Sequence, residues 1–141
     1  MPPLLRFCLV LFALLVVSLH AQAADPRPTP FVMQMTVGDS DAQRRAFLQI
    51  QKVLQDIGPK KVKIEVVAYE SGINALIADN KDTATLVAAL SREGVRFKAC
   101  RISMRGHSLT EADFPIEVEF VPAGAPEMVS LQIKGYRYWR P

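Results

Sequence analysis

The chain has 141 residues, of which 50% are hydrophobic, with a formal net charge of +3 and two cysteines. The first 23 residues hold Arg6 and Cys8, so the remainder keeps one cysteine, Cys100, with 16 basic and 14 acidic residues. This remainder suits a single domain, cannot form an internal disulfide framework or a multi-cysteine metal site, and is too weakly charged to suggest a nucleic-acid partner.

Residues 1–23 have the pattern of a secretory signal peptide. Arg6 supplies the positive charge, Phe7–Leu19 is an almost uninterrupted apolar run of 13 residues, and Ala21–Ala23 is a small-x-small cleavage site. We therefore predict cleavage after Ala23 and a periplasmic protein. A permanent membrane anchor is disfavoured, because a helix of this length spans about 20 Å of a hydrocarbon core of roughly 30 Å. Residues 24–30 contain three prolines and are expected to form a flexible lead-in.

The first half of the mature chain alternates strand and helix patterns. Phe31–Val37 is an apolar run that predicts a first strand. Ser40 opens a capping-box pattern, and the helix that follows ends at Gly58-Pro59. Lys61–Tyr69 is rich in β-branched residues and predicts a second strand. The apolar stripe of the helix consists of Phe47, Ile50, Leu54 and Ile57.

The second half continues this alternation with weaker signals. Asp82 or Thr83 is expected to cap a second helix that ends at Gly94, and Val95–Ile102 is the third strand. Strands that alternate with helices of this length predict an α/β fold, in which helices cover both faces of a parallel sheet. The remaining predicted elements are a helical turn at Thr110–Asp113, a strand at Val118–Val121, a helix at Pro126–Lys134 and a last strand at Tyr136–Trp139.

Three loops at the carboxyl ends of the predicted strands form the expected site, since ligands of open parallel sheets usually bind at that edge. They are Gly38–Ser40, Tyr69–Asn74 and Cys100–His107. Within the second loop, hydroxyl, backbone and amide groups are available to a small ligand from Ser71, Gly72 and Asn74. The alternative is that Gly72 and Asn74 only supply turn geometry. The spacing does not match a phosphate-binding loop.

Cys100 is the residue with nucleophilic chemistry at this edge. A thiolate is its reactive form, and neighbouring cations lower the pKa of a thiol, so Arg101, Arg105 and His107 are candidate stabilising groups. The alternative is a small buried core residue, the usual state of an unpaired cysteine. As a catalytic partner, His107 would need to lie within hydrogen-bond reach of the sulfur, and an exposed histidine or one that packs in a loop is the preferred interpretation.

Several segments resemble the DsrE/DsrF-like family. They are Leu90–Cys100 followed by Ile102–Met104, Val66–Tyr69 followed by Gly72, and the tail from Val121 to Pro141, and the resemblance as a whole extends over about residues 31–141. The resemblance implies a three-layer α/β/α sandwich with a five-stranded, mainly parallel sheet. It also implies oligomers of small subunits, trimers or hexamers. In the sulfur-relay branch of this family, a cysteine after the third strand accepts sulfur as a persulfide, and Cys100 matches that position.

Two functions of different classes follow. The first is an exported, oligomeric protein that binds a small ligand or a protein partner, with Cys100 as a packing residue. The alternative is a sulfur carrier in a relay or sulfur-oxidation pathway, in which Cys100 accepts the persulfide and Arg101, Arg105 and His107 stabilise the thiolate. Either would be a carrier or binder rather than a turnover enzyme, with no cofactor, no metal, and no membrane association after signal cleavage.

Overall fold

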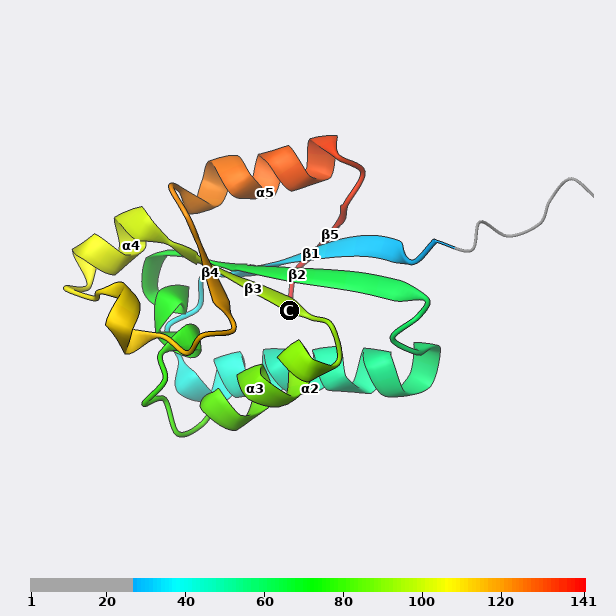
Figure 1. Cartoon of the computed structure of the whole chain (residues 1–141), viewed down its shortest axis with the longest axis horizontal. Coiled ribbons are helices and arrows are strands. Elements are labelled where there is room, and N and C mark those ends of the chain that lie inside the picture. The colour runs from blue at the N-terminus through cyan, green and yellow to red at the C-terminus, as the bar shows by residue number, and fades with distance from the viewer. Residues whose placement is uncertain (1–26) are drawn as a thin grey trace, which may run out of the picture.

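Five parallel strands form one sheet in the computed structural model, which describes residues 27–141 (Figure 1). The predicted signal peptide and the start of the lead-in lie outside the described residues. The strand order is β4-β3-β2-β1-β5, and every neighbouring pair is parallel. The strands are β1 (Thr29–Met35), β2 (Val62–Ala68), β3 (Arg96–Cys100), β4 (Val118–Val121) and β5 (Arg137–Trp139).

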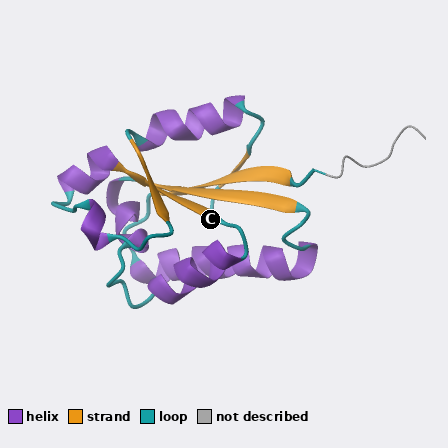
Figure 2. Cartoon of the chain, in the orientation of Figure 1, coloured by secondary structure: helices purple, strands orange, loops and turns teal. Residues whose placement is uncertain are grey.

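Helices cover both faces of the sheet and complete three layers, as Figures 1 and 2 show. The α-helices α2 and α3 lie on one face, α5 crosses the other, and α4 follows β3 directly. None of the helices in the described part of the chain is long and apolar enough to cross a membrane. The helices are α2 (Ser40–Ile57), α3 (Ala84–Arg92), α4 (Arg101–Gly106) and α5 (Gly124–Ile133), with short 3-10 helices η1 (Glu70–Leu76) and η2 (Glu111–Asp113).

The larger hydrophobic core lies between the sheet and the layer of α2 and α3. Alternate strand residues such as Met33 and Ile64 face the predicted stripe of α2, and the rings of Phe47 and Phe97 meet edge to face with centroids 5.4 Å apart. A smaller cluster of Val32, Val67, Met128 and Leu131 lies under α5. This distribution follows from the period-2 alternation of the strands and the 3.6-residue period of the helices.

The first strand begins earlier than predicted. Thr29 and Pro30, the last residues of the predicted lead-in, pair with Val62 and Lys63 of β2. The backbone N–H of Thr29 donates to the carbonyl of Lys61, the residue before β2, so the nitrogen of Pro30 faces the side of β5. Because β5 pairs with β1 only from Phe31 onward, no ladder hydrogen bond is lost at the proline. The strand also ends at Met35, two residues before the predicted end at Val37.

Helix starts were predicted less accurately than the helices themselves. Asp39, not Ser40, is the N-cap of α2, and its carboxylate accepts a hydrogen bond from the N–H of Ala42 at 2.7 Å. The Ser40 hydroxyl instead donates to Asp82 across the fold. Thr83 precedes α3 as predicted, but its hydroxyl donates to the carbonyl of Ala75 and does not cap the helix. Tertiary partners therefore compete for the capping side chains.

A buried carboxylate occupies the middle of β2 on the α5 face. Glu65 is 1% exposed and forms ion pairs with Lys98 at 2.7 Å, Arg96 at 3.2 Å and Lys63 at 3.5 Å, while the Tyr136 hydroxyl donates to it at 2.5 Å. Burial raises the pKa of Glu65, but the hydrogen bonds from Lys98 and Tyr136 and the charges of Lys98 and Arg96 outweigh it. The net pKa therefore lies below its ordinary value.

We expect Glu65→Gln to lower the free energy of unfolding by about 3 kcal/mol near neutral pH, because it removes the negative charge from a buried cluster of cations. Since the folded pKa of Glu65 is lowered, the stabilisation is present above the unfolded value of about 4.3 and is lost as pH falls through the folded pKa. Urea denaturation at several pH values measures this difference. Exposed Glu117→Gln is the control, and an equal loss in both variants would contradict the prediction.

Candidate functional site

The carboxyl ends of the strands meet around the sulfur of Cys100. This residue ends β3 and is also the N-cap of α4, so its side chain lies where the strand turns into the helix. Two backbone N–H groups donate to Sγ, one from Ser103 at 3.5 Å and one from Gly124 at 3.2 Å. The first donor belongs to the same helix, whereas the second comes from the start of α5, after β4. The site is therefore assembled from two neighbouring strand ends.

Ser103 connects this sulfur to the segment that follows β2. Its hydroxyl accepts a hydrogen bond from the backbone N–H of Glu70 at 2.7 Å, which joins α4 to the start of η1. Glu70 itself has a positive φ of 51°, a conformation that non-glycine residues seldom adopt. The end of β2 is therefore the third strand end that belongs to the site, after those of β3 and β4.

Close backbone approach explains how Gly124 reaches the sulfur. A Cβ at Gly124 would lie 2.6 Å from Cβ and Cγ of Tyr69, so only glycine allows α5 to start against this tyrosine. Tyr69 is in turn held by Gln34, whose side-chain amide donates to the Tyr69 hydroxyl at 2.5 Å. The absence of a side chain at Gly124 thus allows its backbone N–H to reach the sulfur of Cys100.

The surroundings of Cys100 favour its thiolate. Burial raises the pKa of the thiol, but the Ser103 hydroxyl and the backbone N–H groups of Ser103, Gly124 and Ile102 favour the charged form and outweigh burial. The net pKa of Cys100 is therefore below its ordinary value. Cys100 is also a free cysteine and only 3% exposed. The sulfur is thus electrostatically prepared for nucleophilic chemistry but covered from solvent.

Ser103→Ala is expected to raise the pKa of the Cys100 thiol, because it removes the hydroxyl that favours the thiolate. The ultraviolet absorbance of the thiolate as a function of pH measures this in the chain without residues 1–23, where Cys100 is the single thiol. The folded pKa is lowered, so the thiolate stabilises the fold above the unfolded pKa of about 8.5, and this contribution is lost as pH falls through the folded value. Exposed Ser71→Ala is the control and should leave the titration unchanged.

The three cations predicted to stabilise the thiolate lie elsewhere on α4. The guanidinium of Arg101 pairs with Glu111 and stacks over the ring of Phe120, 5.3 Å from its centroid. Arg105 is exposed in the last turn of α4, and His107, which is also exposed, is the C-cap of this helix. The pKa of Cys100 is lowered chiefly by Ser103 and backbone N–H groups instead. Hydrogen-bond donors at the start of α4 and of α5 therefore take the role that was predicted for the cations.

The predicted ligand-binding loop forms the 3-10 helix η1, and its three predicted binding residues have different surroundings. Ser71 is exposed, whereas Gly72 is buried against the end of β1, where an added Cβ would lie 2.1 Å from the carbonyl oxygen of Met35. The carbonyl of Asn74 accepts a hydrogen bond from the Asn80 side chain at 2.9 Å. This packing favours the alternative that Gly72 and Asn74 serve the backbone geometry of the turn.

Sequence reasoning missed the groups that hold the sulfur. The third strand was predicted to continue to Ile102, but it ends at Cys100 and α4 begins at once. A helix starting at Arg101 would have made Ser103 its third residue, the position that donates to an N-cap side chain. Gly124 lies 24 residues from Cys100, and no local pattern connects them.

Comparisons with known proteins agree with this architecture. The model of the DsrE/DsrF-like family matches residues 31–140. A solved structure of a protein of unknown function from Methanobacterium thermoautotrophicum is 29% identical, with a TM-score of 0.74, and the match covers 80% of this chain and 99% of that one. No curated protein matches the chain significantly. The three-layer fold with a five-stranded parallel sheet is confirmed.

Proposed function

The chain belongs to the DsrE/DsrF-like family, and from that premise we propose that its mature domain is a sulfur carrier that accepts a persulfide on Cys100. The observation that carries the proposal is the convergence of the N–H groups of Ser103 and Gly124 on the Cys100 sulfur. These donors lower the pKa of the thiol, and the thiolate is the form that attacks sulfur.

The proposed step is a thiol exchange with a persulfide or polysulfide donor. The Cys100 thiolate attacks the terminal sulfur of a donor R–S–SH, a new S–S bond forms on Cys100, and the S–S bond of the donor breaks. The donor leaves as the thiolate R–S⁻, and Cys100 carries the group –S–SH with its proton. No external oxidant or reductant is needed. Transfer to an acceptor thiolate is the same reaction in the other direction.

The setting of this reaction is part of the proposal. The pattern of residues 1–23 supports export and a periplasmic location after cleavage at Ala23. The family resemblance supports a homo-oligomer, a trimer or hexamer, that exchanges sulfur with a relay partner. The Gly124 amide lies 3.2 Å from Sγ, and Cys100 is 3% exposed, so a donor needs this segment to move before it reaches the sulfur.

The direct test of the proposal is the mass of the mature protein after treatment with inorganic polysulfide. The wild type should gain the mass of sulfur and Cys100→Ser should not.

A second candidate function is the exported binding protein without sulfur chemistry. The low exposure of Cys100 favours it, because a cysteine that caps α4 and accepts backbone hydrogen bonds has a structural role already. This alternative requires a native thiol that does not react with a maleimide. It also requires that Cys100→Ala leave the biological role intact. Reaction of the native thiol with both maleimide and polysulfide would exclude it.

A further inference from the structure

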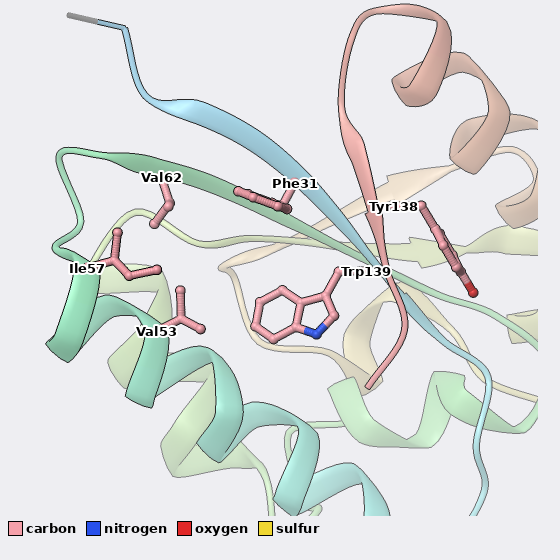
Figure 3. Close-up of a pocket in the computed structure, with 6 residues that line it drawn as sticks. All are labelled: Phe31, Val53, Ile57, Val62, Tyr138 and Trp139. Carbon is pink, nitrogen blue, oxygen red and sulfur yellow. The ribbon is translucent and has the colours of Figure 1, made fainter. Parts of the chain in front are cut away.

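An apolar pocket lies beside the edge strand β5, on the face of the sheet that α2 covers (Figure 3). Its volume is about 330 Å³. The indole of Trp139 extends from β5 into the space next to α2, and Val53 and Ile57 approach it from the last turns of that helix. The lining residues are Phe31, Val53, Ile57, Val62, Tyr138 and Trp139.

The pocket is separate from the site around Cys100. Val62 is the first residue of β2 and Ile57 the last of α2, which places the pocket toward the amino-terminal ends of the strands. Cys100 is the last residue of β3 and lies at the carboxyl edge. An inference about the pocket therefore does not depend on the sulfur chemistry.

The lining defines the kind of molecule that the pocket accepts. None of its six residues is charged, and two of them, Phe31 and Trp139, present aromatic rings. The side chain of Tyr138 points away, and its hydroxyl donates to Gln34 on the other face at 2.5 Å. A volume of about 330 Å³ is at the lower end of the range for small-molecule sites. The body of a ligand should accordingly be small and apolar.

The turn that joins two of the lining residues carries two lysines. Lys60 and Lys61 lie in the turn between the lining residues Ile57 and Val62. The side chains of both lysines are exposed. Neither lysine side chain has an ion-pair partner among residues 27–141. The two acidic residues nearest in sequence have other partners: Asp56 is paired with Lys52 at 2.9 Å, and Glu65 with Lys98 at 2.7 Å. An anionic group on a ligand would complement these ammonium groups.

We propose that this pocket binds a small carboxylate with an apolar body. The body lies against the rings of Phe31 and Trp139, and the carboxylate lies at Lys60 and Lys61. Binding of a carboxylate is a function beyond persulfide transfer, and it uses an edge of the sheet that the proposed carrier reaction leaves unused.

Trp139 reports binding directly, because it is the single tryptophan of the chain. Octanoate, titrated below its micelle-forming concentration, should change the Trp139 emission saturably. The double variant Lys60→Gln/Lys61→Gln should weaken octanoate binding by about threefold or more at low salt, with binding of uncharged octanol unchanged. Lys81→Gln, at a lysine on the far side of the fold, is the matched control. Val53→Phe should fill the pocket and weaken both compounds, and circular dichroism checks that it folds.

Several outcomes would overturn the proposal. The first is that octanoate causes no saturable change in the Trp139 emission. The second is that Val53→Phe still binds octanoate as the wild type does. The third is that the lysine double variant weakens octanoate and octanol binding equally. A second copy of the chain seated in the pocket would also overturn it. That occupant would give a Trp139 emission that depends on protein concentration without ligand, together with a dimer in sedimentation that Val53→Phe dissociates.

Discussion

Cys100→Ser should abolish the uptake of sulfur from inorganic polysulfide. The mature wild type is expected to gain about 32 Da per sulfur atom, and a thiol reductant should remove this mass, because a persulfide is a reversible modification. Without residues 1–23 the chain has one cysteine, so the intact mass locates the modification without fragmentation. Serine is a good helix N-cap, so the variant is expected to keep α4 folded while losing the nucleophile.

Two further variants separate the sources of thiolate stabilisation. Ser103→Ala should slow sulfur uptake, because it removes the hydroxyl that favours the thiolate while the backbone N–H remains. Arg105→Gln should leave uptake unchanged, because Arg105 is exposed at the far end of α4. A wild-type mass that polysulfide does not change would refute the carrier function. Slower sulfur uptake by Arg105→Gln would instead support the stabilisation of the thiolate by cations that the sequence predicted.

Gly72→Ala is expected to destabilise the fold by about 3 kcal/mol, the upper part of the usual range for overpacking. The added Cβ would lie 2.1 Å from the carbonyl oxygen of Met35 and 2.7 Å from the Cα of Thr36, so it would meet backbone rather than a flexible side chain. Tyr69 also donates its N–H to the same carbonyl at 3.0 Å, and that hydrogen bond would be strained. Urea denaturation measures the change in the free energy of unfolding.

Gly106→Ala is the matched control for this substitution. Gly106 is the last residue of α4, and apart from its chain neighbours and the backbone of its own helix no atom lies within 4 Å of the place its Cβ would take. Alanine there should leave stability unchanged or raise it by up to about 1 kcal/mol, because alanine favours helix more than glycine does. If Gly72→Ala were equally harmless, the close approach of η1 to β1 would not be needed, and a ligand-binding role for Gly72 would regain support.

Much of the fold was predictable because its signals are local. The strand Val118–Val121 was predicted with its observed bounds, and the predicted helical turn at Thr110–Asp113 is present as η2, with a capping box between Thr110 and Asp113 that was not predicted. The stripe of α2 packs into the core as predicted except for Ile57, which is 47% exposed and lines the apolar pocket. Alternation and helical periodicity express which face of an element is buried, so these features can be read without knowing the neighbours.

The capping groups and the partners of the sulfur were less predictable. The choice of Asp39 over Ser40 as the cap of α2 depends on Asp82, which takes the Ser40 hydroxyl from across the fold. Similarly, Lys98 shares the strand parity of Cys100 but pairs with Glu65 and Glu127. These side chains could each bind more than one partner, and the partners that they do bind are distant in sequence, so no local pattern identifies them.

The amino-acid sequence by itself determined that residues 31–141 have the strand and helix order of a single α/β domain, and that the one cysteine in this range lies at the carboxyl edge of the sheet. Periodicity and the order of strands and helices are sufficient for these conclusions, because parallel strands with helical crossovers place their carboxyl ends together. Only the tertiary structure decided which groups touch the sulfur and that it is covered. The Gly124 amide reaches Cys100 because β3 and β4 are neighbours in the sheet, a contact that arises from packing rather than from any local pattern.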